Sequence, residues 1–417
     1  MRILIVSQYF WPENFRINDL AEELSRRGHA VTVLTGRPNY PEGRVFADYR
    51  ANPQDYARLG DVPVIRVPML ARGSSSIRLM LNYLSFAVSA TLLGIWKLRG
   101  QRFDGIFVFQ ISPITAALPA IALRRVKRAP MLMWVLDLWP DTLAAIGVVR
   151  SPRLLSLVGR LVRFVYDHCD RILVQSRAFT DKVAALAGGA ERIRYFPGWA
   201  ESLFDGETPA ERAPELAAYD DDFKILFAGN IGEAQDFPAI IAAADALRDT
   251  PGLRWLIVGD GRAAVQVREE IARRGLQDKI VLLGRFPLER MPSFFASADA
   301  LLVTLRKEPI WSLTIPGKVQ SYLAAGKPLL AMLDGEGSRV IEEAKAGLVA
   351  PAGDGQALAA QVRRLMAMNE GERAAIGRNG IAYGQREFGR PQMVDALENW
   401  IVECRSGSPR ASSFPAR

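Results

Sequence analysis

The sequence predicts an α/β protein built from two doubly wound domains, and three observations support this expectation. Short apolar runs alternate with amphipathic helical stretches along both halves of the chain. An acidic break containing proline separates the halves at Ser202–Asp222. A chain of 417 residues is also too long for one ordinary hydrophobic core. We therefore expect two Rossmann-like domains that face each other across a cleft, one over residues 1–200 and the other over residues 201–388.

The first half contains strand candidates that are apolar along nearly their whole length, which is typical of strands buried inside a parallel sheet. They are Arg2–Phe10, Ala30–Thr35, Val62–Val67, Phe103–Phe109, Met131–Asp137, Arg171–Gln175 and Ile193–Phe196. Helical patterns lie between several of them, as at Ile17–Arg27 and Leu154–His168. This alternation predicts a sheet covered by helices on both faces.

The same alternation restarts after the break, with helical patterns between a second set of strand candidates. These are Phe223–Gly229, Arg254–Gly259, Lys279–Leu283, Ala300–Leu305, Pro328–Leu333 and Gly347–Val349. The last residues, 405–417, are rich in serine, proline and arginine, and their composition predicts a disordered tail.

Composition narrows the classes of function. The net charge of +8 favours an anionic partner, which includes nucleic acid, anionic lipid and phosphate-bearing substrates. Two cysteines far apart, Cys169 and Cys404, give no disulfide framework and no zinc spacing, so we expect a reducing cytoplasm. The N-terminus lacks the pattern of a signal peptide. With only His29 and His168 present, we expect no histidine-based metal site and no cofactor.

One segment, Leu79–Trp96, has no charged residue over eighteen positions. That length is at the lower edge of what spans a bilayer, but a span here would cut the first sheet in two. The alternatives to a span are a buried or surface-facing helix of the first domain and a helix attached to an anionic membrane surface. Basic residues nearby make attachment to anionic lipid a reasonable second role.

The strongest local signal is the run Thr314–Lys318, which predicts a helix start with Thr314 as N-cap and Pro316 in the first turn. Gly326 is the expected stop of this helix. A helix N-terminus presents backbone N–H groups and partial positive charge, which suit a diphosphate. Lys318 is out of place there, because the helix dipole disfavours a cation, unless an anion is bound. The alternative interpretation is an ordinary surface lysine.

Three glycine-containing turns follow strand candidates of the second half, at Gly229–Asp236, Gly259–Gly261 and Gly284–Pro287. Glycine allows close backbone approach to a ligand, although each turn alone is weak evidence. Backbone groups of the third turn are suited to reading the edge of a base, with a side chain against its face. The candidate ligand contacts in these turns are Asn230, Gly232, Gln235, Gly259, Arg285 and Phe286.

Two loops of the first half, Gln8–Arg16 and Thr35–Gly43, carry polar and aromatic residues at strand ends, where a second ligand is expected to bind. The candidate contacts are Glu13, Asn14, Phe15, Arg16, Asn39 and Tyr40. Plain packing is the alternative for the aromatic residues.

Asp137 ends an apolar strand and is a candidate general base or hydroxyl ligand. Glu308 is a further carboxylate near the predicted phosphate helix, suited to holding sugar hydroxyls or to pairing with its basic neighbours.

These motifs together resemble the retaining GT-B glycosyltransferases of family four, across nearly the full chain. Within them the sequence is most similar to bacterial transferases of N-acetyl-L-fucosamine and related amino sugars in O-antigen and capsule assembly. The resemblance is carried by the stretches SQYFWPENFRINDLA, LTGRPNYPEG, LDLWPD, YFPGWAESLF, GNIGEAQDF, VGDG and LTIPGKVQSYLAAGKP.

The resemblance implies a UDP-sugar donor in the second domain, held at Ile315, Pro316, Gly317, Lys318 and Ser321 together with the glycine turns. It implies a lipid-diphosphate-linked or lipopolysaccharide glycan acceptor in the first domain. It also implies transfer with retention, without a metal, by an enzyme peripheral to the inner face of the cytoplasmic membrane. The C-terminal helix, at 389–404, is implied to cross back onto the first domain.

The sequence departs from the family pattern at several positions. Two glutamates that the family carries ahead of Gly-Lys-Pro correspond to Leu313 and Ser321, so Ser321 is left to make a weaker contact with the ribose. The basic residues of the family's glycine turn correspond to Asn230 and Gln235. Lys318 is then implied to carry more of the diphosphate's charge, helped by Arg306 or Lys307. A histidine often placed beside the donor sugar corresponds to about Leu136.

Our hypothesis is that Lys318 neutralises the leaving diphosphate while an acceptor hydroxyl attacks, with Asp137 and Glu308 as further catalytic candidates and no protein nucleophile. A UDP-sugar 2-epimerase on the same architecture is one alternative, although neither histidine is placed for its chemistry. A non-catalytic protein that binds sugar or a membrane surface is another. No nucleic-acid partner is expected, because the basic residues follow no nucleic-acid-binding motif.

Overall fold

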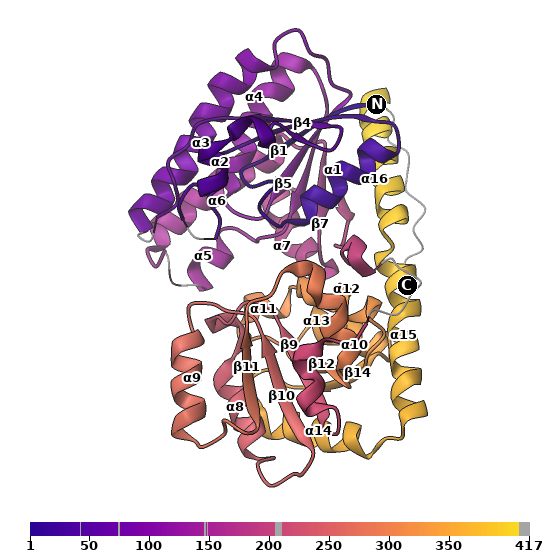
Figure 1. The fold of residues 1–417 in the computed structure, drawn as a ribbon. Coiled ribbons are helices and arrows are strands. Elements are labelled where there is room, and N and C mark those ends of the chain that lie inside the picture. The colour runs from indigo at the N-terminus through magenta and orange to yellow at the C-terminus, as the bar shows by residue number, and fades with distance from the viewer. Residues whose placement is uncertain (42, 74–75, 146, 148, 205–210, 408–417) are drawn as a thin grey trace. The chain divides into compact units, whose positions relative to one another are not determined.

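The computed structural model describes residues 1–41, 43–73, 76–145, 147, 149–204 and 211–407. The chain divides into two compact units, Met1–Pro197 with Pro391–Arg417, and Gly198–Arg390 (Figure 1). The boundary lies three residues before the predicted one. Part of the predicted hinge, 205–210, and most of the predicted tail, 408–417, lie outside the described residues.

Unit 1 contains an eight-stranded sheet in the order β3-β4-β2-β1-β5-β6-β7-β8. All pairings are parallel except that of β3 with β4. The strands are β1 (Arg2–Ser7), β2 (Ala30–Thr35), β3 (Arg58–Leu59), β4 (Val62–Arg66), β5 (Gly105–Gln110), β6 (Met131–Val135), β7 (Arg171–Val174) and β8 (Ile193–Tyr195). All seven predicted strands are confirmed. The two-residue β3 was not predicted, because it is too short to show a period.

Helices cover both faces of this sheet, which explains why its strands are apolar along their length. In Figure 1, α3, α4 and α6 lie to one side, and α1 and α16 lie to the other. The helices are α1 (Arg16–Arg26), α2 (Ala47–Ala51), α3 (Ser76–Lys97), α4 (Leu118–Lys127), α5 (Asp141–Ala145), α6 (Pro152–Asp167), α7 (Thr180–Ala187) and α16 (Arg390–Ser406).

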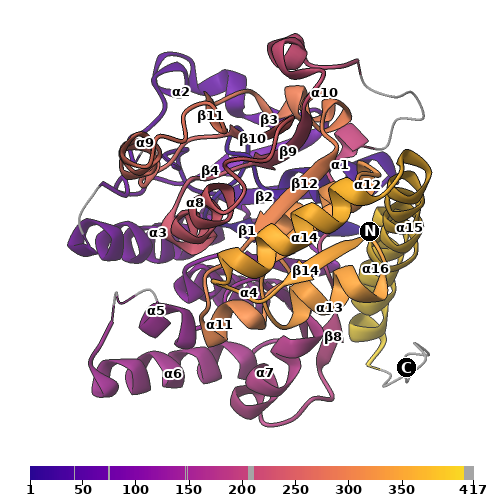
Figure 2. The same ribbon diagram turned by 90° about the horizontal axis from the view of Figure 1, so that it is seen from below.

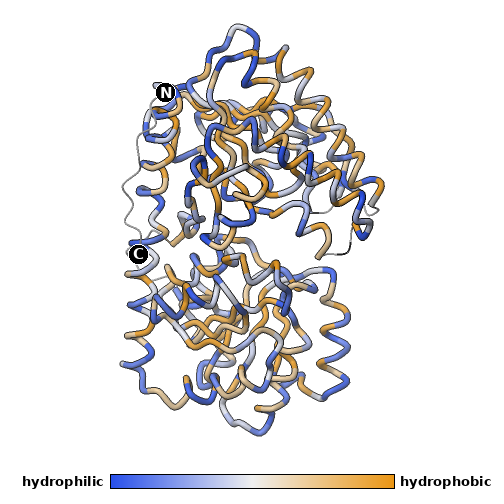
Figure 3. The backbone as a smooth tube through the Cα atoms, turned by 180° about the vertical axis from the view of Figure 1, so that it is seen from behind, coloured by the Kyte–Doolittle hydropathy of each residue, from blue (hydrophilic) through white to orange (hydrophobic). Residues whose placement is uncertain are grey.

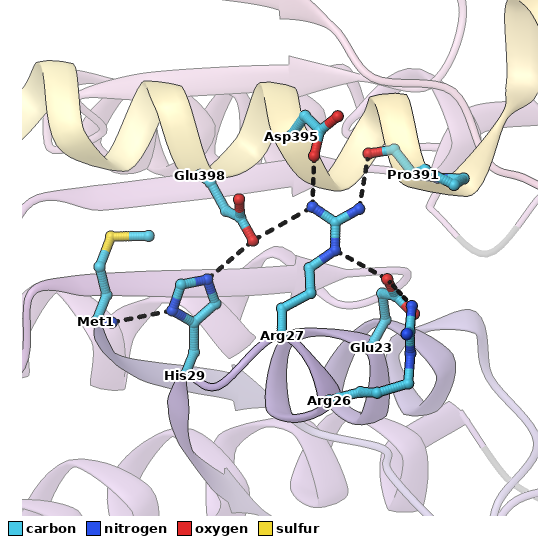
Figure 4. Close-up of polar contacts among 8 residues, drawn as sticks. All are labelled: Met1, Glu23, Arg26, Arg27, His29, Pro391, Asp395 and Glu398. Carbon is cyan, nitrogen blue, oxygen red and sulfur yellow. Dashed lines mark hydrogen bonds and ion pairs between the residues drawn. The ribbon is translucent and has the colours of Figure 1, made fainter.

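Helix α16 confirms the predicted return of the chain to the first domain. A Cβ added to Gly105 on β5 would lie 2.9 Å from Ile401, so α16 packs directly on the sheet. Arg27, just after α1, donates to Asp395 and to the Pro391 carbonyl, and its guanidinium also pairs with Glu23 (Figure 4). This guanidinium therefore ties the last helix of the chain to the first.

Unit 2 contains a six-stranded parallel sheet in the order β11-β10-β9-β12-β13-β14. Its strands are β9 (Phe223–Ala228), β10 (Leu253–Val258), β11 (Ile280–Gly284), β12 (Ala300–Thr304), β13 (Leu329–Met332) and β14 (Gly347–Ala350), which confirms all six predicted strands. Its helices are α8 (Phe237–Asp245), α9 (Ala264–Arg273), α10 (Met291–Ser297), α11 (Pro309–Ser312), α12 (Gly317–Ala324), α13 (Glu336–Glu343), α14 (Gly355–Ala367) and α15 (Glu370–Phe388).

Two apolar cores lie on the two faces of this sheet. One joins the strands to α8, α9 and α14, and the other joins them to α10, α12, α13 and α15. Helices α12 and α15 run side by side (Figure 2). Hydrophobic segments gather in the interior of each unit (Figure 3). The fold class predicted from the sequence is confirmed in each unit.

Each sheet has one point where consecutive connections reverse direction. In unit 1 this point lies between β1 and β5, and in unit 2 it lies between β9 and β12. Loops diverge there on opposite sides of the sheet and leave a crevice at the carboxyl ends of the strands, where ligands bind in open α/β sheets. The strand order therefore directs attention to the residues that follow these four strands.

The Arg27 cluster predicts a difference between two neighbouring arginines that both pair with Glu23. Arg27 is 20% exposed and Arg26 is 73% exposed. Removing one partner of a half-buried ion pair costs more stability than removing one partner of an exposed pair. Arg27→Leu should therefore lower the free energy of unfolding by roughly 1–3 kcal/mol. The matched Arg26→Leu should change it by less than about 1 kcal/mol. Equal effects in urea unfolding would show that α16 is not held by Arg27.

Candidate active site

Three glycine turns meet at the carboxyl ends of neighbouring strands of unit 2. The Gly229 N–H donates to the Val258 carbonyl at 2.8 Å, and the Gly259 N–H donates to the Gly284 carbonyl at 2.8 Å. Gly229 and Gly259 have φ of 140° and 143°, a region that side chains disfavour. A Cβ on Gly259 would lie 1.8 Å from the Gly229 oxygen. The first two turns therefore stack backbone against backbone, with no room for a side chain at Gly259.

Lys318, in the first turn of α12, lies against this glycine stack. A Cβ on Gly229 would lie 2.6 Å from the Lys318 Cε, and the Nζ lies 3.4 Å from the centroid of the Phe227 ring. Among the described residues, no carboxylate or hydrogen-bond acceptor reaches this ammonium. Burial lowers its pKa to about 7. The site thus holds a desolvated cation whose contacts within the described chain are to an aromatic face and a glycine backbone.

The start of α12 differs from the prediction by one position. Pro316 has ψ of 132° and is the N-cap, and the helix begins at Gly317. Thr314 lies two residues before the N-cap, so its predicted capping role is wrong. Gly326 has φ of 67° just after the helix, as expected for a C-terminal stop. The first turn still presents its backbone N–H groups and the positive end of the dipole beside Lys318.

Gln235 braces the first glycine turn. Its Oε1 accepts from the Gly232 N–H at 3.2 Å and from the Asn230 Nδ2 at 3.5 Å. Its carbonyl accepts from the Thr304 Oγ1 at 2.5 Å, at the end of β12. The turn after β9 is thereby fixed to the strand across the switch point. Gln235 shapes the loop, while the exposed Asn230 is the side chain more open to a ligand.

Ser321 has a partner that sequence reasoning missed. Its Oγ donates to the Glu201 carboxylate, which comes from the start of unit 2. Ser321 is buried, with 6% of its surface exposed. Ser321 stands on α12 where the family has a glutamate. A carboxylate still lies beside this position, because Glu201, 120 residues earlier in the chain, supplies it. The motif YFPGWAESLF contains Glu201, but nothing in the sequence connects it to Ser321.

The other predicted residues of unit 2 take varied positions. Arg285 is exposed after β11, and the Phe286 ring packs 4.7 Å from Phe294. The Ile315 side chain is buried in the core, which leaves only its backbone for a ligand. Glu308 is the N-cap residue of α11, with its carboxylate 4.0 Å from Arg306. This contact favours the pairing interpretation of Glu308 over direct sugar binding.

In unit 1, Glu13 joins the two predicted loops. Its buried carboxylate accepts from the backbone N–H groups of Asn39 at 2.8 Å, Tyr40 at 2.7 Å and Phe10 at 3.1 Å. Burial raises its pKa to about 7 despite these bonds. Asn39 is fully buried, and its Oδ1 accepts from the Arg72 N–H at 3.2 Å. Glu13 and Asn39 therefore hold the loops in place rather than facing a ligand.

Aromatic rings fill the space between these loops. The Phe15 ring lies 5.7 Å from Tyr9 and 5.2 Å from Tyr40, and the Arg72 guanidinium lies 5.4 Å from the Tyr40 ring. Packing is thus the principal role of Phe15 and Tyr40. Of the remaining candidates, Asn14 is exposed beside this cluster and Arg16 begins α1.

A buried polar cluster lies at the switch point of unit 1. Gln8 follows β1, and the strand register places it beside Gln110 at the end of β5. The Gln8 Nε2 donates to the Asn82 Oδ1 on α3 at 2.7 Å. Within the described chain, the Gln8 Oε1, both amide atoms of Gln110 and the Thr115 Oγ1 are buried without a hydrogen-bond partner. Buried polar atoms are rarely left unpaired, so this cluster is suited to ordered water, or to ligand hydroxyls once the surrounding loops move to admit them.

Asp137 lies two residues beyond β6, the strand next to β5. Desolvation raises the pKa of its carboxyl to about 7. Among the described residues, no cation or hydrogen-bond donor pairs with this carboxylate. A carboxyl group with this pKa exchanges a proton near neutral pH, as a general base requires. Asp141, four residues further along the chain, begins α5 and pairs with Lys182 at 3.0 Å.

Both units match models of known protein families. Residues 14–199 match the model described as glycosyl transferase 4-like domain, and residues 222–368 match the model described as glycosyl transferases group 1. This chain belongs to the group 1 glycosyltransferases.

Individual relatives agree with this assignment. The putative colanic acid biosynthesis glycosyl transferase WcaI of Escherichia coli is 28% identical over 345 residues, which cover 78% of this chain and 82% of that protein. The probable glycosyltransferase WbjE of Pseudomonas aeruginosa is 26% identical and matches 77% and 78% of the two chains. The crystal structure of HepE from Anabaena, in complex with UDP, superimposes with a TM-score of 0.68 at 15% identity and covers 97% of this chain and 100% of that chain. This likeness shows the GT-B fold.

In this glycosyltransferase, no group of three or more histidine, cysteine, aspartate or glutamate side chains that could hold a metal occurs among the described residues. The candidate substrate contacts among these residues are the Lys318 ammonium in unit 2 and Asp137 with the polar cluster in unit 1. The sequence singled out Lys318 and Asp137. It missed Gln110, Thr115 and Glu201, whose surroundings arise from strand register and from long-range packing.

Lys318 predicts opposite effects on stability and on activity. Its folded-state pKa of about 7 is below the ordinary value of 10.5, so stability increases as pH rises between these values. Lys318→Met removes the desolvated charge and should raise the melting temperature at pH 7. The same change should lower kcat/KM by roughly 100- to 1,000-fold, because the leaving group loses its cation. The control is Lys279→Met, which lies just before β11, at the end of that strand opposite to the Gly284 turn. It should leave kcat/KM unchanged. A Lys318→Met enzyme with normal turnover would refute this role.

Gln110 predicts a similar separation. Gln110→Leu replaces an unpaired buried amide with an apolar side chain of similar size and should leave the melting temperature unchanged or raise it. If the amide binds the acceptor, kcat/KM for the acceptor falls by roughly ten- to a hundredfold while the KM for the donor is unchanged. Gln361→Leu, which removes an amide paired with the Val349 carbonyl in unit 2, should instead lower stability alone. Unchanged acceptor kinetics in Gln110→Leu would assign the cluster to water.

Proposed function

We propose that this glycosyltransferase moves an amino sugar, N-acetyl-L-fucosamine or a relative, from a UDP-sugar to a lipid-linked glycan. The reaction belongs to the synthesis of a cell-surface polysaccharide such as O-antigen, lipopolysaccharide or capsule. Transfer proceeds with retention and without a metal ion, on the inner face of the cytoplasmic membrane. The observation that carries the proposal is the unpaired Lys318 ammonium at the N-terminus of α12, beside the glycine turns.

This geometry suits a nucleoside diphosphate leaving group. The backbone N–H groups at the start of α12 and the Lys318 ammonium converge where the carboxyl ends of β9 and β12 diverge. A diphosphate gains most charge as the glycosidic bond breaks, so a preorganised cation stabilises the transition state more than the bound donor. The neighbour HepE was solved with UDP, which supports UDP as the nucleotide.

The acceptor binds in unit 1, where the buried polar groups that lack a hydrogen-bond partner among the described residues are uncharged amides and a hydroxyl. The amides of Gln8 and Gln110 and the Thr115 hydroxyl suit sugar hydroxyls rather than an anion. Asp137 is placed to accept a hydroxyl proton or to bind a sugar hydroxyl near neutral pH. The role of WcaI in colanic acid biosynthesis, as its name gives it, supports an extracellular polysaccharide as the product.

The proposal is tested first on the donor. A panel of UDP-sugars is screened by thermal shift, since a ligand that binds the folded state raises the melting temperature. We expect UDP-amino sugars to give the largest shifts and Lys318→Met to lose them. Transfer is then followed with a diphosphate-lipid-linked acceptor, and NMR of the first product reports the anomeric configuration. Activity that survives EDTA supports metal independence. An inverted product, or isomerised UDP-N-acetylglucosamine formed without acceptor, would overturn the proposal.

A further inference from the structure

Helix α3 has two opposite apolar faces, and only one of them is covered. Asn82, Phe86, Ala90 and Gly94 recur every four residues and face the unit's interior. A Cβ on Gly94 would lie 2.8 Å from Leu34 of β2, so the helix packs tightly on the sheet. On the opposite face of the helix, large apolar side chains that are 46% to 72% exposed form a stripe. This stripe consists of Ile77, Met80, Leu81, Leu84, Val88, Leu92 and Trp96.

The contacts of the covered face exclude a membrane span for this helix. The segment Ile77–Lys97 is long and apolar enough to cross a membrane, and 28% of it is buried inside the unit. Its Asn82 bonds both Gln8 and the Leu70 carbonyl, so the helix is anchored beside the switch point of the sheet. A helix that crossed the bilayer would have to give up these contacts. The helix is therefore placed to lie along a surface, with its stripe outward.

A second helix of the same layer repeats the pattern. Helices α3 and α6 both pack on the 3-10 turn Ile114–Ala117, and both lie on the same side of unit 1 in Figure 1. Helix α6 exposes Leu157 and Phe164, with the exposed Arg160 between them. Large exposed apolar side chains on two helices of one layer are of the kind that marks an interaction surface.

The positive charge around α3 favours an anionic partner for this surface. Residues 62–136, which include α3 and α4, contain ten basic residues and one acidic residue, a net charge of +9 against +8 for the whole chain. The one acidic residue, Asp104, pairs with Arg405. Arg99, which lies 4.7 Å over the Trp96 ring, and the exposed Arg102, Arg125 and Arg128 have no carboxylate within 4.0 Å among the described residues. A second copy of this chain would bring the same uncompensated positive charge.

We infer that the stripe of α3, with the neighbouring face of α6 and these arginines, docks unit 1 on an anionic lipid membrane. The apolar side chains enter the boundary between headgroups and acyl chains, while the arginines contact anionic headgroups. A tryptophan with an arginine stacked on it, at the end of the stripe, suits the polar interface of a bilayer. The inference deepens the proposed function, because a lipid-linked acceptor is then met at the surface where it resides.

Vesicle sedimentation tests the inference without donor or acceptor, so its result does not depend on the proposed reaction. The full chain should bind vesicles containing about one-third phosphatidylglycerol in phosphatidylcholine, and bind pure phosphatidylcholine at least about tenfold more weakly. The triple variant Leu84→Gln, Val88→Gln, Leu92→Gln should lose roughly a hundredfold in binding to the anionic vesicles. Its far-UV circular dichroism and its urea unfolding midpoint should match those of the wild type, which shows that unit 1 is folded.

Two controls sharpen the test. Val265→Gln on α9 and Val402→Gln on α16 remove side chains that are 57% and 51% exposed, and they should bind vesicles as the wild type does. Arg99→Gln with Arg125→Gln and Arg128→Gln should weaken binding to anionic vesicles but not to neutral ones. The inference is overturned if the wild type ignores anionic vesicles or binds neutral ones equally well. It is also overturned if the triple variant dissociates a dimer in solution, since a second copy would then cover the stripe.

Discussion

The desolvated ammonium of Lys318 is the constraint around which unit 2 is arranged. Its side chain occupies the space that a Cβ on Gly229 would need, and the Gly229 carbonyl in turn occupies the space that a Cβ on Gly259 would need. Each glycine is therefore required by the group packed on it. Holding a cation over Phe227 with a pKa of about 7 costs stability in the free protein. In the proposed function, a bound diphosphate supplies the missing countercharge, so the stability lost in the free protein is recovered as binding energy.

The two units use the same topology for different chemistry. Each places its candidate contacts on the loops that diverge at the switch point of its sheet. Unit 2 presents a cation and a helix N-terminus there, which suit an anion. Unit 1 presents neutral amides and a carboxyl group with a raised pKa, which suit sugar hydroxyls and a proton transfer. This division between an anionic donor and the neutral sugar of an acceptor is expected of an enzyme that moves a sugar between them.

The sequence predicted well what local patterns determine. Apolar runs located every strand except the two-residue β3, and the misplaced charge of Lys318 was visible against the helix dipole. Contacts between distant segments were not predictable in this way. Glu201 meets Ser321 across 120 residues, and Gln110 becomes a site candidate only once the register places it beside Gln8. The loop sequence predicts Glu13 as an acceptor contact, because nothing in it shows that three backbone N–H groups donate to this carboxylate.

The positive charge of the chain also acquires a more specific meaning. From composition alone, it fitted nucleic acid, lipid and phosphate substrates equally. The structure gives grounds to separate these partners, because the proposed donor site uses one lysine and backbone groups, whereas the segment 62–136 carries a net charge of +9. Charge at that density is not needed to bind one diphosphate. Since it accompanies an uncovered apolar stripe on α3, it is better explained by an extended anionic surface than by a small anion.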